Sequence, residues 1–187
     1  MEYRIIEHSF EPVYDEYSRI LILGSLPSVK SRENNFYYGH PKNRFWRVLW
    51  RIFEENGCNN ETGETSRLRD STLTEMSIDS FSIEEKKKFL HDNHIALWDV
   101  IAKCDIMGSS DSSIKNVIAN DINLILDSAA IEAIYVNGTK AHELYMKYCY
   151  PGTGREAVKL PSTSPANAAW TLERLIASWS IINRAYK

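Results

Sequence analysis

The amino-acid sequence predicts an α/β fold of three layers, α/β/α, with a central four-stranded parallel sheet. Short apolar runs typical of buried strands occur in four places: residues 19–23, 95–101, 133–136 and 157–160. Helical patterns separate most of these runs, and strands that alternate with helices form parallel sheets covered on both faces. Ligands of such folds bind beyond the carboxyl ends of the strands, so the loops that follow the runs are the expected site.

The clearest helical pattern begins at Asn43. Apolar residues recur at spacings of three and four from Trp46 to Phe53, which predicts a helix with one face in the core. Asn43 suits the N-cap of this helix, and Gly57 suits its end. Four more helices are expected: from a capping box of Ser82 and Glu85 to about 93, over 121–128, over 139–148 with Thr139 as cap, and from about 168 nearly to the C-terminus.

Length and composition indicate one soluble domain over residues 1–187, with a polar, irregular insertion at 59–80. The loop 108–113 is expected to be flexible. No apolar run is long enough to cross a bilayer, and the N-terminus lacks a signal-peptide pattern, so a cytoplasmic protein without membrane contact is expected. The three cysteines have no metal-ligand spacing. We therefore expect reduced thiols, no metal and no cofactor.

The net charge of −3 argues only weakly against nucleic acid as a partner, because a local patch can supply the phosphate contacts. Between Gly24 and Arg51 the chain has six basic residues and a single acid, Glu33. This local excess favours an anionic partner, although a solvated helix face would have the same composition.

Three loops should meet along one rim of the sheet, because each follows a predicted strand: residues 24–46, 137–140 and 162–167. The first is long for its fold class and carries Phe36, Tyr37, Tyr38, His40 and Asn43. Aromatic rings in such a loop suit stacking on a base that has left the duplex.

The residues of these loops resemble the motifs of the uracil-DNA glycosylase superfamily. Gly24-Ser-Leu-Pro-Ser28 and Tyr38-Gly-His-Pro-Lys-Asn-Arg-Phe-Trp46 are similar to the first motif region, and the second string is similar to that of mismatch-specific uracil-DNA glycosylases. Ser162-Thr-Ser-Pro-Ala-Asn-Ala168 resembles the second motif, and Asn137-Gly-Thr-Lys-Ala141 the turn between them. The resemblance runs from Arg19 to the C-terminus, but residues 59–80 match nothing.

The departures from these motifs point to one branch. Relatives position the attacking water with Asp or Asn in the first motif, where this chain has Ser25 and Leu26. The second motif begins with Ser162 instead of His or Asn, and Ala166 replaces a leucine wedge. This combination looks most like the hypoxanthine-DNA glycosylase branch, in which the Asn of the His-Pro-x-Asn string is the important catalytic residue. That position is Asn43.

The resemblance implies a set of site residues. Asn43 is the expected catalytic residue, with its amide oxygen orienting water or stabilising the cationic sugar. The expected base-binding residues are Gly24, Ser25, Leu26, Tyr38, His40 and Ser162. The expected DNA-binding residues are Pro27, Ser28, Lys140, Ser164, Pro165 and Asn167, with Asn167 entering the gap left by the flipped nucleotide.

Simpler roles compete with these assignments. Asn43 would serve equally well as a helix cap alone. His40 suits a supporting role, and only one of Tyr37 and Tyr38 can stack on the base. Asp99 ends a strand on the same rim and suits either a second acid or a turn residue.

The predicted activity is that of a monofunctional DNA glycosylase, which excises hypoxanthine from double-stranded DNA in base-excision repair and acts as a monomer. Within the same class, a uracil or G:T/G:U mismatch glycosylase is the alternative. Two other classes stay open: a non-catalytic protein that binds damaged DNA, and a small-nucleotide binder.

Overall fold

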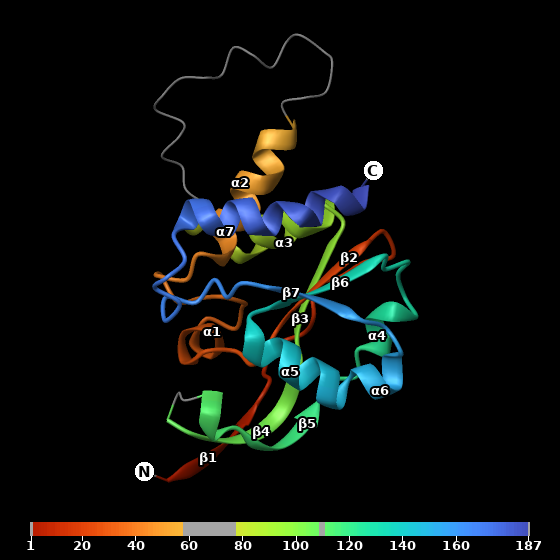
Figure 1. The fold of residues 1–187 in the computed structure, drawn as a ribbon. Coiled ribbons are helices and arrows are strands. Elements are labelled where there is room, and N and C mark those ends of the chain that lie inside the picture. Colours follow the sequence, from red (N-terminus) through yellow and green to blue (C-terminus); the bar gives the residue numbers. More distant parts are fainter. Residues whose placement is uncertain (1, 58–77, 109–110, 187) are drawn as a thin grey trace.

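The computed structural model describes residues 2–57, 78–108 and 111–186. Its core is a four-stranded sheet in the order β3-β2-β6-β7, and all its neighbouring strands are parallel (Figure 1). These strands are β2 (Ile20–Gly24), β3 (Ile95–Asp99), β6 (Ala133–Asn137) and β7 (Ala157–Leu160). Every residue of β2 and β3 is buried, which explains their continuous apolar runs. The predicted parallel sheet is therefore confirmed.

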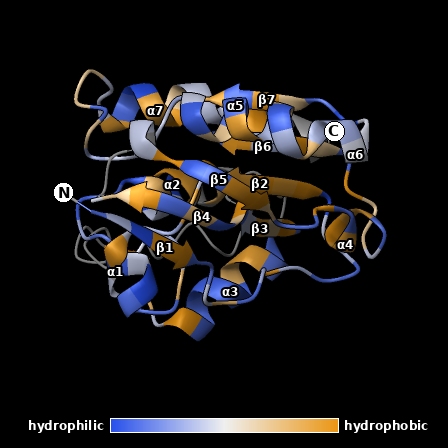
Figure 2. Cartoon of the chain, turned by 90° about the horizontal axis from the view of Figure 1, so that it is seen from below, coloured by the Kyte–Doolittle hydropathy of each residue, from blue (hydrophilic) through white to orange (hydrophobic). Residues whose placement is uncertain are grey.

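Helices cover this sheet in the predicted three-layer arrangement. The longer ones are α2 (Phe45–Gly57), α3 (Ile83–Asp92), α5 (Thr139–Tyr148) and α7 (Leu172–Trp179). Figure 1 shows α2, α3 and α7 on one side of the sheet and α5 on the other; α5 packs on β6 and β7. Figure 2 shows the orange, hydrophobic colouring of the strands β2 and β6.

Short helices fill the connections. They are α1 (Val29–Glu33), α4 (Asn123–Leu126) and α6 (Tyr150–Thr153), with 3-10 turns η3 (Ile78–Ser80), η4 (Asp111–Ser113) and η5 (Ser180–Tyr186). The predicted insertion 59–80 falls outside the described residues except for η3, and part of the predicted loop 108–113 forms η4. Within the described ranges, no helix has the length and apolar character needed to span a membrane.

The strand predicted over 95–101 is wrong at its end. β3 stops at Asp99, and β4 (Ile101–Met107) belongs to a second, antiparallel sheet in the order β1-β4-β5, with β1 (Tyr3–Glu7) and β5 (Lys115–Ala119). β4 is only half-buried, with Ile101, Cys104 and Ile106 inward. Apolar residues resume at Val100 and Ile101 directly after Asp99, so the charged Asp99 was the only local sign of the break.

Three helix starts also differ from prediction. α2 begins at Phe45, two residues after Asn43, and α5 begins at Thr139 with Gly138 as its cap. The last helix begins at Leu172, not near Ala168, because the Thr171 side chain caps it by accepting from Arg174 N. Residues 162–170 are therefore a long loop, and its backbone is held by tertiary contacts instead of helical hydrogen bonds.

The strand register places the functional loops together. Gly24 is the register partner of Asp99, Leu23 that of Val136, and Asn137 that of Leu160. The four strands thus end at one edge of the sheet, and the three predicted loops leave from that edge.

Candidate active site

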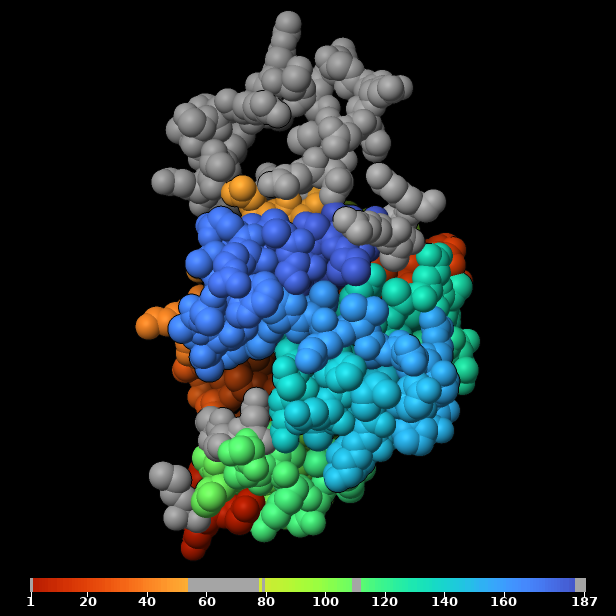
Figure 3. All heavy atoms as spheres, in the orientation of Figure 1, coloured from red at the N-terminus to blue at the C-terminus, as the bar shows by residue number. Residues whose placement is uncertain are grey.

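A cavity of about 920 Å³ lies at this edge of the sheet. All three predicted loops line it, with residues 24–32, 137–140, 159–162, 164 and 166–167 among its walls. Figure 3 shows one face of the molecule on which the orange-brown segment after β2, the blue segment after β7 and the cyan start of α5 come together. The convergence predicted from strand ends alone is confirmed.

Asn43 lies in the wall of the cavity at the end of a hydrogen-bonded chain. Thr163 Oγ1 donates to Asn43 Oδ1 over 2.9 Å, and the backbone N–H of Phe45 donates to the same oxygen over 3.0 Å. Asn137 Nδ2 in turn donates to Thr163 Oγ1 over 2.9 Å, while Asn137 Oδ1 accepts from Thr163 N. These hydrogen bonds therefore connect all three loops of the site.

These hydrogen bonds determine which end of the Asn43 amide is available to a ligand. Both lone pairs of Oδ1 are occupied, so the orientation of the amide is set. Nδ2 has no hydrogen-bond acceptor among the described residues. The available group of Asn43 is thus an N–H donor, whereas the sequence suggested that its oxygen would act.

Thr163 is the site residue that the sequence did not single out. It is fully buried. Its hydroxyl is the only link between Asn137 and Asn43 in this chain of bonds. The Ser-Thr-Ser-Pro sequence marks the turn, but it does not distinguish Thr163 from its neighbouring serines. Only the fold shows that Thr163 is buried while the serines are partly exposed.

Arg44 shapes the loop 162–170. Its guanidinium donates to the carbonyl oxygens of Thr163, Ser164, Asn167 and Trp170. Arg44 therefore belongs to the folded framework, because its N–H groups are used within the protein, although its positive charge remains. Arg32 likewise donates to Pro27 O, and Lys30 pairs with Glu33 at 2.6 Å in the open. The N–H donors of Arg44 and Arg32 are thus engaged within the protein, and the Glu33 already counted in this region pairs with Lys30.

The predicted residues of the second motif form a tight turn. Ser162 Oγ accepts from Ser164 N, Ser164 Oγ accepts from Ala166 N, and Asn167 Nδ2 donates to Ser162 O over 2.8 Å. Ser162, Ser164, Ala166 and Asn167 line the cavity, whereas the exposed Pro165 does not. Asn167 thus uses its amide N–H within its own loop.

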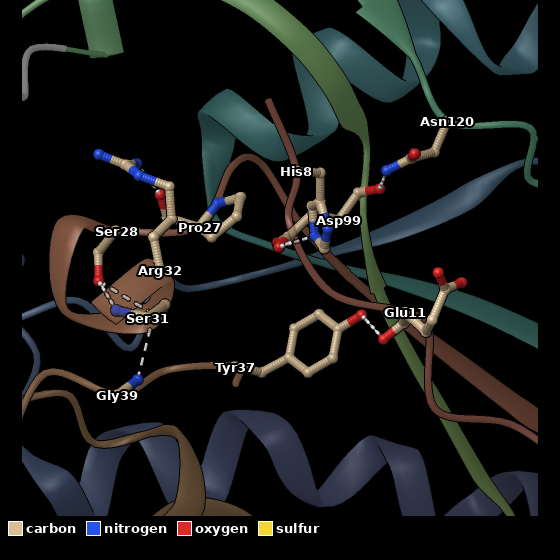
Figure 4. A network of polar contacts seen from close by, with 10 residues as sticks. All are labelled: His8, Glu11, Pro27, Ser28, Ser31, Arg32, Tyr37, Gly39, Asp99 and Asn120. Carbon is tan, nitrogen blue, oxygen red and sulfur yellow. Dashed lines mark hydrogen bonds and ion pairs between the residues drawn. The ribbon is translucent and has the colours of Figure 1, made fainter. Parts of the chain in front are cut away.

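The first loop is folded onto α1. Ser28 Oγ caps α1 by accepting from Ser31 N, and Ser31 Oγ accepts from Gly39 N over 3.1 Å (Figure 4). His40 makes a turn, since its Nδ1 accepts from Lys42 N and its carbonyl oxygen from Asn43 N. This geometry gives His40 the supporting role that the sequence allowed, and it delivers Asn43 to the cavity wall.

The two tyrosines of this loop point in different directions. Tyr37 is buried and its hydroxyl donates to Glu11 O over 2.9 Å, so Tyr37 is a core residue (Figure 4). Tyr38 lines the cavity, with one ring face stacked on Phe45 at 3.8 Å between ring centroids. Phe36, Phe45 and Trp46 are also buried. The segment 36–46 is therefore part core and part site.

The Tyr38 hydroxyl is enclosed and finds no hydrogen-bond partner within the described chain. Burial, reinforced by the negative charge of Asp99, raises the pKa of Tyr38 far above its usual value, so the hydroxyl keeps its proton. Tyr38 also has a positive φ of 53°, which is uncommon for a residue with a bulky side chain.

Asp99 and His8 form a buried pair at the floor of the cavity. His8 Nε2 lies 3.0 Å from Asp99 Oδ2, and both side chains are almost fully buried (Figure 4). A Cβ on Gly24 would lie 2.1 Å from Asp99 Oδ1, so only glycine fits opposite this carboxylate. Gly138, at φ 98°, is likewise a position that needs glycine, because a side chain there would collide with Ser162.

Lys140 lines the cavity mouth, and its Nζ lies 3.9 Å from Glu143. Among the residues that the structure describes, no group of three His, Cys, Asp or Glu side chains is placed to hold a metal ion.

Comparison with known families accounts for this arrangement. The family model of the Uracil DNA glycosylase superfamily matches residues 11–183, which is nearly the whole chain. The chain belongs to the uracil DNA glycosylase superfamily. This membership agrees with the parallel sheet and with the site at its carboxyl edge.

Individual members of the superfamily are similar over most of their length. A hypoxanthine DNA glycosylase from Methanosarcina acetivorans is 33% identical over 181 residues, which cover 96% of this chain and 99% of the relative. One from Methanosarcina barkeri is 32% identical over 162 residues, covering 86% and 88%. A solution NMR structure from M. acetivorans, described as a uracil DNA glycosylase, superposes with a TM-score of 0.73 at 31% identity, covering 98% of this chain and all of that one.

This member of the uracil DNA glycosylase superfamily therefore brings most of its predicted site residues to one cavity. The exception is Pro165, which lies outside the wall. The structure adds His8, which the sequence had not placed near the site, and it gives Asn137 and Thr163 a hydrogen-bonding role that the motifs alone did not.

Proposed function

We propose that this protein is a DNA glycosylase that hydrolyses the N-glycosidic bond of hypoxanthine in DNA. The observation that carries the proposal is the Asn43 amide, which Thr163 and the Phe45 N–H fix in the cavity wall with its NH2 group unbonded. Ser25 and Leu26 stand where other members place a water-holding Asp or Asn. The two similar Methanosarcina proteins of this superfamily carry the name hypoxanthine DNA glycosylase, which supports the same substrate.

The reaction asks for charge stabilisation more than for a strong base. As the bond from C1′ to the base breaks, its electron pair leaves with the base, and the sugar becomes oxocarbenium-like. Water adds its oxygen to C1′ and gives up a proton, so the products are an abasic site and neutral hypoxanthine. Fixed N–H donors stabilise the negative charge on the departing base. The Asn43 NH2 group and the N–H groups of residues 24–26 are the donors in this proposal.

The flipped nucleotide enters through the mouth formed by the three loops. The open side of Tyr38 stacks on the purine, while Phe45 supports the other face of its ring. Lys140 and Ser164, which line the cavity, contact phosphates along the mouth. We propose a monomer acting on double-stranded DNA, with Ala166 too small to fill the gap that the flipped base leaves.

A glycosylase panel tests this proposal. Duplexes that hold inosine, uracil or thymine opposite each normal base are incubated with excess protein, and alkali-labile products are counted. We expect release of hypoxanthine in single-turnover conditions. Release of uracil alone would assign the mismatch activity instead, and tight binding to the inosine duplex without any product would make the protein a non-catalytic binder.

A further inference from the structure

Asp99 is a buried carboxylate whose hydrogen bonding is only half complete. Oδ2 pairs with His8 Nε2 at 3.0 Å. Nε2 must carry hydrogen in this contact, because a carboxylate can only accept. Oδ1 has no partner within residues 2–57, 78–108 and 111–186. A buried charged oxygen without a donor is costly, so the site gains when a ligand supplies an N–H or O–H there.

The surroundings of Asp99 hold this oxygen in place. The His8 ring packs against Phe10 and Tyr37 with ring centroids 4.5 and 6.0 Å apart. Asn120 Nδ2 donates to the backbone carbonyl of Asp99 over 2.8 Å (Figure 4). Oδ1 packs close to the Gly24 backbone, where a Cβ would lie only 2.1 Å from it, so the glycine lets the carboxylate take this position. The carboxylate is therefore positioned before any substrate arrives.

The depth of Asp99 indicates which part of a nucleotide it meets. It ends β3, beside the end of β2, and only 4% of its surface is exposed although it lines the cavity. A flipped nucleotide enters base first, and its sugar stays near the mouth with the DNA backbone. The floor of the cavity thus faces an edge of the base, whereas the water attacks C1′ nearer the mouth.

We propose that Asp99, held by His8, reads the lactam edge of the flipped base by accepting a hydrogen bond from N1–H of hypoxanthine. This inference rests on the proposed glycosylase function. Hypoxanthine has a hydrogen on N1, whereas adenine, from which it arises by deamination, has a lone pair there. A fixed acceptor favours the N1 hydrogen of hypoxanthine and repels the N1 lone pair of adenine. A site built around this hydrogen bond therefore discriminates strongly against adenine.

A comparison of two substrates distinguishes recognition of the base by Asp99 from a role of Asp99 toward the water or the sugar. One duplex carries deoxyinosine, and the other carries deoxynebularine, an unsubstituted purine with a lone pair on N1. Single-turnover rates are measured for the wild type, for Asp99→Asn and for the control Asp92→Asn, which changes an exposed carboxylate on α3. Dividing each variant rate by the wild-type rate removes the intrinsic difference between the two leaving groups.

Asp99→Asn should slow hypoxanthine release at least about a hundredfold, because the Asn amide keeps its oxygen toward His8 and turns its NH2 group toward N1–H. The same variant should cleave deoxynebularine as fast as the wild type or faster, since NH2 complements the N1 lone pair. Asp92→Asn should change neither rate. An equal loss on both substrates in Asp99→Asn would overturn the inference and point to water or sugar instead.

A measurement on the wild-type protein guards against a variant that fails to fold. The duplex then carries 1-methyl-deoxyinosine, in which a methyl group replaces the N1 hydrogen. We expect its base to be released at least about a hundredfold more slowly than hypoxanthine. Release within threefold of the hypoxanthine rate overturns the role of Asp99. Absence of hypoxanthine release by the wild type would instead overturn the proposed function itself.

Discussion

Thr163 Oγ1 donates a hydrogen bond to Asn43 Oδ1 over 2.9 Å, between residues that are 120 positions apart in the sequence. This contact decides how the Asn43 amide is turned. It leaves the NH2 group, not the oxygen, available at the cavity wall. It also ties the first loop of the site to the second motif, so the two cannot move independently without breaking it.

Asn43 can be tested with two replacements. Asn43→Ala should slow single-turnover hypoxanthine release at least about a hundredfold, because it removes the fixed donor. Asn43→Asp keeps the oxygen that caps Phe45 N and accepts from Thr163, but it has no NH2 group. It should therefore keep the thermal stability of the wild type and lose activity like Asn43→Ala. An active Asn43→Asp would leave Asn43 a helix cap only.

Thr163 should matter through its hydroxyl. Thr163→Val keeps the shape of the side chain but leaves Asn137 Nδ2 without its acceptor and Asn43 Oδ1 without one of its two donors. We expect a loss of about 1–3 kcal/mol in the free energy of unfolding, and at least a tenfold loss of hypoxanthine release. Thr163→Ser retains the hydroxyl and serves as the control. Urea denaturation and single-turnover assays of both variants measure these losses. Equal activity in the two variants would show that the Thr163 hydroxyl is dispensable.

Two replacements of Tyr38 distinguish the contribution of its ring from that of its hydroxyl. Tyr38→Phe removes a buried hydroxyl that has no partner in the described chain, so the free energy of unfolding should rise by about 1 kcal/mol and Tm by about 2–4 °C. Its activity should stay within about threefold of the wild type, since stacking needs only the ring. Tyr38→Ala should lose at least about tenfold. Scanning calorimetry and base release are the measurements, and a destabilised Tyr38→Phe would mean that the hydroxyl is bonded in solution.

The protein should lose stability at alkaline pH, partly through Cys149. Burial, aided by the negative charge of Asp121, raises the pKa of the Cys149 thiol to about 11. In the unfolded chain the thiol ionises near pH 8.5, so the unfolded state binds fewer protons between about pH 9 and 11 and stability falls there with rising pH. Cys149→Ala should flatten this slope, sparing about 3 kcal/mol by pH 11 in urea titrations. Parallel curves for wild type and variant would contradict the assignment.

Much of the fold and the location of the site could be predicted from the sequence. The four buried strands leave continuous apolar runs, because both faces of a parallel sheet are covered. The loops after them are marked by Gly, Pro, Ser and Asn, so their meeting at one edge follows from the strand direction. The second sheet was missed because apolar residues resume directly after Asp99, which made β3 and the start of β4 look like one strand. The start of α7 was misplaced because Thr171 caps it.

Local sequence determined which segments form strands, helices and site loops, since hydrophobic periodicity and turn residues act over short distances. Only the tertiary structure decided which atoms face the cavity. The Thr163–Asn43 contact and the His8–Asp99 pair join residues 120 and 91 positions apart, and no local pattern encodes such partners. The reason is physical: a buried polar group must find its hydrogen-bond partner wherever the folded chain brings one near.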